Sequence, residues 1–398
     1  MEKFRVISDL HLDYNHDYPV KLKKDGIFTL IAGDLCGESH VIHTKSSRKE
    51  LTVHVNMEAF QKKFGDKAKV VFKYTKPENK DIGEWSVNGK QVALRECKVS
   101  ISGEWKDGDK VTVEIYRPSD WVDKNISSGL LVAGNHVVYT HTKKPIEDIK
   151  KGLSEQYPID SNFSFLDQST GIMSKEVDGI LFIGSTLYTN YELKIKNFNP
   201  SGNVTTNMRV ASPKMSGGGL NDFNYGRTVE GTYKKQPWDD DDGIYFLTPE
   251  SYLRFFNRTF AEIKRLVEEN KDKEIVILTH HCPSPKCAYG EYVDNGLNAS
   301  YMSDLTDFII KHKNIKCWVC GHVHHRASFK IGDCLCIMNP LGYIKHGEYV
   351  ENGGNWSPNT FVNTKTWTVE KEEYSNKTWD NTIKEYRNNI LKYAGIFF

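Results

Sequence analysis

The sequence lacks long apolar runs and strong net charge, and each absence excludes a class of protein. None of its apolar runs approaches the roughly 20 residues that a membrane-spanning helix needs, so no membrane segment is expected. The net charge is +1 with 26% charged residues, so no overall field marks a nucleic-acid or membrane binder, and any such binding must be local. Hydrophobic residues make up 38% of the 398 residues, which suits a folded protein with a large core.

A signal peptide and a dense framework of cysteines are also not expected. The first apolar strand begins at Phe4, which predicts a cytoplasmic protein. The eight cysteines are dilute and lie mostly in or beside predicted strands, so they are expected to be reduced. Cys317 and Cys320 have the spacing of half a zinc site, but positions i and i+3 of a strand face opposite sides. Small buried strand residues are the favoured interpretation.

What the sequence does contain is a repeated pattern of apolar strands that end at metal-binding side chains. Such runs cover residues 4–7, 28–32, 130–133, 275–279 and 317–320. They are followed in turn by Asp9 and His11, by Gly33-Asp34, by Gly134-Asn135-His136, by His280-His281 and by Gly321-His322-Val323-His324. Buried strands of this kind deliver their polar ends to one edge of a sheet. The sequence therefore predicts a single site built from five strand ends.

The ligand set suits two metal ions. The candidate ligands are Asp9, His11, Asp34, Asn135, His280, His322 and His324, more than one tetrahedral ion needs. They fit two divalent ions about 3.5 to 4 Å apart, with Asp34 as the bridging carboxylate. Because the set mixes oxygen and nitrogen without thiolate, Mn²⁺ is favoured, with Fe, Zn²⁺ and Ni²⁺ as alternatives. No other cofactor is predicted.

Two such ions predict phosphoester hydrolysis. They lower the pKa of a bridging water from about 15.7 towards neutrality, and they hold the oxygens of an in-line displacement at phosphorus. The expected nucleophile is therefore a metal-bridging hydroxide. His136 stands beside the ligand Asn135 and is the predicted catalytic residue, either protonating the leaving alkoxide or stabilising charge on the phosphorus centre.

Between the second and third of these motifs the sequence changes character. Short alternating β-branched runs at 51–55, 70–74, 91–101 and 111–115 are separated by turn signals such as Asn88-Gly89, and one helix is predicted over 57–64. This predicts a β-rich domain, residues 41–121, inserted into a main domain of residues 1–40 and 122–370. Its interleaved basic and aromatic residues suit either single-stranded nucleic acid or a solvated surface. The solvated surface is favoured, and a partner or substrate contact stays a hypothesis.

The rest of the chain gives weaker signals. Residues 191–247 are predicted to be long loops with little core, and their acidic run 239–242 to be solvated rather than cation-binding. His16 is interpreted as a surface loop residue, with a substrate contact as the alternative. Helices are predicted over 304–311 and, as an amphipathic tail within 371–398, over 379–393. Another helix is capped by Thr248 with Pro249 at its first position, and its expected apolar face is Leu253, Phe256, Phe260, Ile263 and Val267.

In their order along the chain, the five motifs resemble those of the calcineurin-like metallophosphoesterases. The resemblance implies an α/β fold, a four-layer α/β/β/α sandwich of two mixed sheets. It also implies one ion held by Asp9, His11, Asp34 and His324, a second held by Asp34, Asn135, His280 and His322, and His136 near the leaving group. Segments 182–188, 221–223 and 339–343 are similar to small phage and bacterial members of the family, which would place a phage-encoded protein in the host cytoplasm.

The sequence departs from the family at two places. Many relatives have Glu where Val137 stands, and the protein serine/threonine phosphatases have Asp-Arg-Gly where this chain reads Leu35-Cys36-Gly37. The preferred function is therefore a phosphodiesterase acting on a nucleotide or nucleic-acid ester. A phosphoprotein or monoester phosphatase, and a binding protein with a vestigial metal site, are the alternatives. The chain is expected to be a monomer or a small homo-oligomer.

Overall fold

The computed structural model describes residues 1–15, 20–37, 40–78, 83–139, 144–212, 219–224, 229–232, 244–351, 356–372 and 374. The chain divides into two compact units, one of residues 1–11, 22–37 and 125–398 and the other of residues 12–21 and 38–124. The predicted limits at 41 and 121 stay a prediction, since this division also assigns 12–21 to the second unit. Among the described residues there is no helix with the length and apolar character needed to span a membrane.

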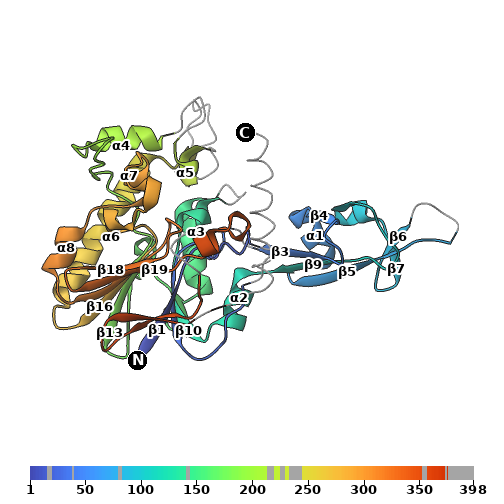
Figure 1. Ribbon diagram of the computed structural model, residues 1–398, viewed down its shortest axis with the longest axis horizontal. Helices are drawn as coiled ribbons and strands as arrows, with labels where there is room; N and C mark the ends of the chain where they lie inside the picture. The colour runs from blue at the N-terminus through green and yellow to red at the C-terminus, as the bar shows by residue number, and fades with distance from the viewer. Residues whose placement is uncertain are drawn as a thin grey trace. The chain divides into compact units, whose positions relative to one another are not determined.

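The first unit contains two mixed sheets of six strands (Figure 1). In the first sheet four parallel strands lie in the order β11, β10, β2, β1, and β20 and β21 follow in antiparallel pairing. The bounds are β1 Lys3–Ile7, β2 Phe28–Ala32, β10 Ser128–Val132, β11 Phe163–Phe165, β20 Thr360–Asn363 and β21 Thr368–Lys371. Because β1, β2 and β10 run parallel, their carboxyl ends meet at one edge.

The second sheet repeats this design. Its order is β12, β13, β16, β17, β19, β18, with a parallel centre and one antiparallel strand at each edge. The bounds are β12 Ser174–Val177, β13 Ile180–Ser185, β16 Glu274–Thr279, β17 Ile315–Cys320, β18 Ala327–Ile331 and β19 Cys334–Met338. The neighbouring strands β16 and β17 therefore also end side by side.

The two sheets share one hydrophobic core. Phe4 of β1 packs edge-to-face on Phe182 of β13, with ring centroids 5.9 Å apart. Further core residues come from both sheets and include Val6, Leu30, Leu130, Val276, Leu278, Val319 and Ile337. Strands covered on both faces read as continuous apolar runs, which is how they were visible in the sequence. Helices α3 (Ile146–Gln156) and α6 (Pro249–Glu269) pack beside β11 and β13. The predicted α/β sandwich of two mixed sheets is confirmed.

Helix α6 begins as predicted but buries a slightly different face. Thr248 caps it, accepting a hydrogen bond from the Ser251 backbone N–H, and Pro249 follows in the first turn. The buried stripe consists of Tyr252, Phe255, Phe256, Thr259, Ile263 and Val267. The expected Leu253 and Phe260 are only partly buried, because Tyr252 and Phe255 turn towards the ring of Tyr188. Helix α8 spans Thr306–Lys311, two residues shorter than predicted.

The prediction of little core in residues 191–247 was wrong. This region contains α4 (Val204–Ala211), α5 (Asn221–Asn224), β14 (Val229–Thr232) and β15 (Ile244–Phe246). It buries Tyr191, Leu193, Ile195, Ala211 and Leu220. A buried side-chain amide gives two backbone carbonyls of this region their hydrogen bonds: Asn207 Nδ2 donates to the carbonyls of Tyr191 (2.7 Å) and Leu193 (3.1 Å). The acidic run 239–242, His16 and the predicted helix 379–393 lie outside the described residues.

The second unit is the β-rich region predicted from the sequence pattern. It has an antiparallel sheet in the order β3, β9, β5, β6, β7, a pair β4–β8, and helix α1 (Met57–Phe64). The strands are β3 Val41–Ser46, β4 Thr52–Val55, β5 Ala68–Thr75, β6 Glu84–Val87, β7 Lys90–Val92, β8 Val99–Ser102 and β9 Lys110–Tyr116. Its own core includes Phe60, Phe72, Trp85, Val111 and Val113.

One predicted strand of this unit proved to be two. The run 91–101 is divided by a short 3-10 turn, Leu94–Cys97, and the next residue, Lys98, has a left-handed backbone with φ of 51°. Strands β7 and β8 therefore pair in different sheets. The alternation of apolar and polar side chains is interrupted at this turn by the adjacent polar residues Arg95 and Glu96, a break that the predicted single strand passed over.

Candidate metal centre

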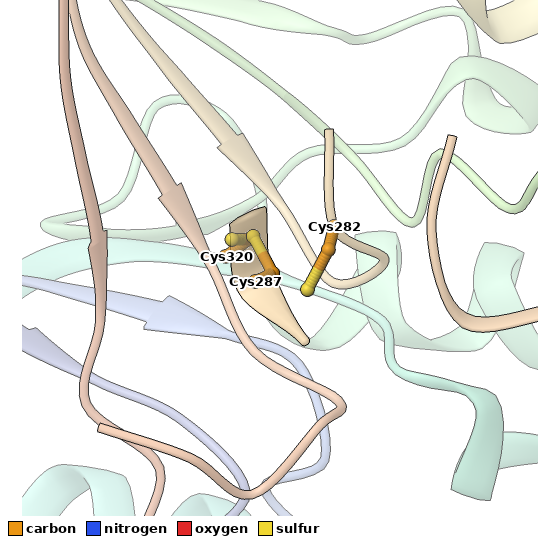
Figure 2. Close-up of side chains that lie close together, drawn as sticks. All are labelled: Cys282, Cys287 and Cys320. Carbon is orange, nitrogen blue, oxygen red and sulfur yellow. The ribbon is translucent and has the colours of Figure 1, made fainter. Parts of the chain in front are cut away.

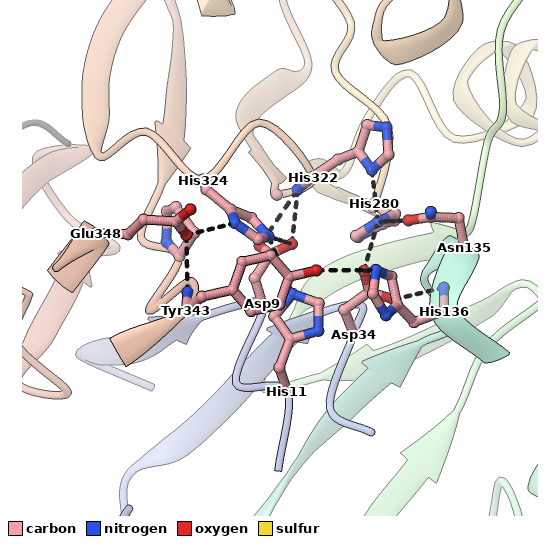
Figure 3. Close-up of polar contacts among 12 residues, drawn as sticks. Asp9, His11, Asp34, Asn135, His136, His280, His322, His324, Tyr343 and Glu348 are labelled. Atoms are coloured by element: carbon pink, nitrogen blue, oxygen red, sulfur yellow. Dashed lines mark hydrogen bonds and ion pairs between the residues drawn. The ribbon is translucent and has the colours of Figure 1, made fainter. Parts of the chain in front are cut away.

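The structure brings all seven predicted ligands and His136 together where the strands end (Figure 3). Asp9 and His11 follow β1, Asp34 follows β2, and Asn135 and His136 follow β10. From the second sheet, His280 follows β16, and His322 and His324 follow β17. Six of these side chains are buried, and His322 and His324 are partly buried, with His324 15% exposed. The strand-end convergence expected from the sequence is therefore present across both sheets.

The backbone at these positions is turned sharply out of the strand direction. Asp9, His11, Asp34, His322 and His324 all have left-handed φ values, between 43° and 71°. Such backbone is unfavourable for residues with a side chain, at about 1 kcal/mol or more each, and persists only where surrounding structure holds it. Five instances in one place indicate that the loops are held for the positions of their side chains.

A first group of ligand atoms lies around His11 and His324. Their Nε2 atoms are 2.9 Å apart, and Asp9 Oδ1 is 3.5 Å from His324 Nε2. Two ring nitrogens that face each other cannot both be acceptors, so either one proton or a cation must lie between them. A cation satisfies both lone pairs and the nearby carboxylate together.

A second group lies around His280. Its Nε2 is 2.9 Å from Asn135 Oδ1, 3.3 Å from Asp34 Oδ2 and 3.1 Å from His322 Nδ1. Asp34 also clusters with His11 and His136, its ligand atoms and theirs lying within 4.8 Å of one another. Asp34 therefore lies between the two groups. The donor set, carboxylate and amide oxygens with imidazole nitrogens, fits divalent cations.

The pKa values of the histidines also indicate where cations would bind. Burial disfavours the charged form of His280, but the Asp34 carboxylate more than offsets this and raises the pKa of His280 to about 9. Burial likewise opposes charge on His324, whereas its hydrogen bonds with Asp9 and Glu348 raise its pKa to about 10. Burial, and then the neighbouring His136, hold the pKa of His11 well below its usual value. Protons on His280 and His324 thus occupy places where cations would bind.

The sequence matches the family model of the calcineurin-like phosphoesterases over residues 99–326, which is more than half of the chain. This protein belongs to that family. The predicted family and the predicted enzyme class, a phosphoester hydrolase, are confirmed, and membership implies divalent metals and a phosphoester substrate. The matched stretch contains Asn135, His136, His280, His322 and His324, whereas Asp9, His11 and Asp34 precede it.

Two solved structures resemble this metallophosphoesterase at low identity. Phosphopantetheinyl hydrolase from Mycobacterium tuberculosis has a TM-score of 0.48 and 12% identity, covering 87% of this chain and 91% of that one. A putative 5'-nucleotidase from Staphylococcus aureus has a TM-score of 0.37 and 12% identity, covering 97% of this chain and 58% of that one. These similarities say nothing about the substrate of this chain. No curated protein matches the sequence.

A carboxylate that sequence reasoning missed orients the candidate ligand Asn135. Asp222 Oδ1 accepts a hydrogen bond from Asn135 Nδ2 (3.0 Å) and another from the Tyr139 hydroxyl, and its Oδ2 accepts one from Tyr252 (2.6 Å). This fixes Asn135 with its oxygen towards His280. The metallophosphoesterase therefore has a carboxylate beside Asn135, although none stands at position 137. The only sequence signal was the resemblance of segment 221–223 to the family.

A second missed carboxylate orients His324. Glu348 Oε2 accepts from His324 Nδ1 at 2.7 Å and from the Tyr343 backbone N–H at 2.7 Å, which directs His324 Nε2 towards His11. The backbone plays the same part for His280, whose Nδ1 donates to the Ala32 carbonyl at 2.9 Å. Such contacts set the tautomer and the ring position of metal-binding histidines. No motif in the sequence singles out Glu348.

The centre opens into a cavity of about 200 Å³. Its lining comprises Asp34, Asn135, His136, Tyr139, Gly219, Leu220, Asn221, Asp222, Tyr301, His322, His324 and Tyr343. His136 stands at the boundary between cavity and ligands, with Nε2 3.3 Å from the Tyr343 hydroxyl and 4.0 Å from Asp34 Oδ2. This is a suitable place for a group that acts on a bound phosphoester.

Proposed function

We propose that this metallophosphoesterase uses two ions, with Mn²⁺ favoured, to hydrolyse the diester bond of a nucleotide or nucleic-acid substrate. One ion is assigned to Asp9, His11, Asp34 and His324, and the other to Asp34, Asn135, His280 and His322. The observation that supports this proposal most strongly is the pair of ligand groups that meet at Asp34. When bound, the ions supply an acidified water and offset the charge of the phosphoryl oxygens.

The protein groups around the cavity have roles of their own. His136 lines the cavity and is assigned to protonate the leaving oxygen, and the Tyr343 hydroxyl, 3.3 Å from its Nε2, holds the ring. Tyr301 also lines the cavity, and its hydroxyl is assigned to donate a hydrogen bond to a non-reacting phosphoryl oxygen, whereas the Tyr139 hydroxyl already donates to Asp222.

The charge of the lining favours a diester over a monoester. No Lys or Arg is among the described residues that line the cavity. A monoester at neutral pH carries a charge of about −1.5 to −2, whereas a diester carries one negative charge. Beyond the metals, the described lining offers hydroxyl and imidazole groups, which suit the singly charged substrate.

The test compares bis-p-nitrophenyl phosphate with p-nitrophenyl phosphate, each with added Mn²⁺. Hydrolysis of the diester in clear preference to the monoester is expected. Turnover of the monoester alone would identify a phosphatase, and no turnover of either by metal-loaded protein would favour a binding protein with a vestigial site. A screen of cyclic nucleotides, dinucleotides and single-stranded oligonucleotides then addresses the leaving group.

Metal binding should strengthen as the pH rises. In the metal-free protein His280 has a pKa of about 9 and His324 of about 10, so below pH 9 each keeps a proton that a cation must displace. Each ion is therefore expected to bind about tenfold more tightly per pH unit between pH 7 and 9. Calorimetric titration with Mn²⁺ in buffers of different ionisation enthalpy counts the released protons. Affinity that does not change with pH would contradict these assignments.

A methyl group at position 134 should damage the centre. A Cβ there would lie 1.9 Å from Asp34 Oδ1 and 2.5 Å from the Asp34 backbone nitrogen, so Gly134→Ala must displace the shared carboxylate. We expect at least a tenfold loss of Mn²⁺ affinity, measured by titration. Gly152→Ala in α3 is the matched control, because no atom lies within 4 Å of the added Cβ, and it should bind as the wild type does.

We also propose that residues 41–121 form a separate inserted domain. The hydrophobic core of this region is internal to it, with Phe60, Phe72 and Val113 among its members. Joining residues 40 and 122 through a short flexible linker should therefore leave Mn²⁺ binding within about twofold of the intact protein. An insoluble product, or one that no longer binds metal, would count against these limits. Unchanged metal binding with altered substrate preference would assign the insert to substrate selection.

A further inference from the structure

Three buried cysteines from separate segments of the chain lie close together (Figure 2). Cys282 lies in the turn after β16, Cys287 ends the 3-10 turn Pro285–Cys287, and Cys320 is the last residue of β17. All three are completely buried, and their sulfur atoms lie within 4.8 Å of one another. The cluster is distinct from the ligand set at Asp34, which contains no sulfur.

The spacing of the sulfurs is close to that of a thiolate metal site. With metal–sulfur bonds of about 2.3 Å, thiolates around one zinc ion are separated by about 3.8 to 4.0 Å. The three sulfur atoms lie within 4.8 Å of one another, so they need to move inward only slightly to reach this separation. Another soft sulfur lies beside one member of the cluster, because Met338 Sδ is 3.7 Å from Cys282 Sγ.

A fourth cysteine, Cys317, is close in sequence but does not belong to the cluster. It lies on the same strand as Cys320, but it packs in the hydrophobic core between the two sheets, as expected for a residue on the other face. Cys317 and Cys320 therefore belong to different surroundings, the core and the cysteine cluster, and do not share a metal. Cys320 instead meets Cys282 and Cys287, whose positions no strand pattern could predict.

We propose that Cys282, Cys287 and Cys320 bind one thiophilic divalent ion of the zinc class, separate from the catalytic pair. Soft thiolates select such an ion over Mn²⁺, and a divalent charge offsets three buried thiolates better than a monovalent one. The ion is structural. Cys282 stands two residues after His280 and Cys320 two residues before His322, so one ion joins the two loops that carry these ligands. Because the site is buried, the ion enters as the chain folds.

The experiment uses full-length protein produced in zinc-supplemented medium and purified under reducing conditions with excess Mn²⁺. Elemental analysis counts the retained zinc, and X-ray absorption at the zinc edge identifies its neighbours. We expect one zinc per chain with sulfur neighbours at about 2.3 Å, against about 2.0 to 2.1 Å for nitrogen or oxygen ligands. Cys287→Ala should reduce the retained zinc at least tenfold. Cys317→Ala, a buried cysteine of the neighbouring core, is the matched control and should retain it.

Three results would overturn the proposal: wild-type protein without zinc, zinc with only nitrogen and oxygen neighbours, or zinc unchanged by Cys287→Ala. The zinc content and the zinc neighbours of the wild-type protein test the proposal even if a variant does not fold. X-ray absorption detects sulfur neighbours without any measurement of hydrolysis. Failure of this proposal is therefore distinguishable from failure of the proposed phosphodiesterase activity.

Discussion

His136→Ala is expected to lower the turnover of a diester with an alkoxide leaving group by about 10² to 10⁴-fold, the usual contribution of a general acid. Metal binding should be unaffected. Residue 136 contacts Asp34, the proposed shared ligand, through its backbone N–H, which donates to Asp34 Oδ1 at 3.0 Å and is retained in alanine. Steady-state kinetics and metal content measured on the same preparation separate the two effects.

The choice of leaving group provides the control for this variant. A p-nitrophenolate leaves without needing a proton, so His136→Ala should lose much less activity on bis-p-nitrophenyl phosphate than on an alkyl diester. Equal losses on both would indicate that His136 acts on the phosphoryl group rather than the leaving oxygen. Loss of metal would show instead that His136 is a ligand, in the group that it forms with His11 and Asp34.

Asp34→Asn should abolish most activity by removing the shared carboxylate. The pKa of Asp34 is held well below its usual value, because the charges of His280 and His136 outweigh the effect of its burial, so it is ionised in the folded protein. An amide in its place carries no charge to hold two cations together. We expect metal content after desalting to fall close to background and turnover to fall at least 10³-fold.

The matched control for that variant is Asp333→Asn, which replaces an exposed aspartate in the turn between β18 and β19. It should retain both ions and full turnover. An Asp34→Asn protein that still carries two ions would show that the bridging ligand is another residue, with Asp9 as the first to examine, because it also groups with His280.

The strand ends could be predicted from the sequence because two local patterns coincide there. Residues 28–32 and 275–279 are predicted to be buried strands by their apolar side chains, and a candidate metal ligand follows each, Asp34 after Gly33 and His280 directly. Parallel strands then bring such residues to one edge by geometry alone. The fold and the candidate ligands therefore followed from short stretches of sequence and the resemblance that they carry.

The residues that orient these ligands could not be found in the same way. Asp222 reaches Asn135 across 87 positions of sequence, and Glu348 lies in a short helix, α9 (Glu348–Glu351), with no apolar periodicity. Their roles depend on loop conformation, which side-chain patterns do not encode. Similarly, Cys282 and Cys287 lie in turns, so the meeting of their thiols with Cys320 could be recognised only in three dimensions.

The number and position of the metal ions can be measured most directly in crystals grown or soaked with Mn²⁺. An anomalous difference map is expected to show two peaks about 3.5 to 4 Å apart, with the carboxylate of Asp34 between them, His11 and His324 beside one, and His280 and His322 beside the other. A single peak, or two peaks that do not share Asp34, would contradict a dinuclear centre.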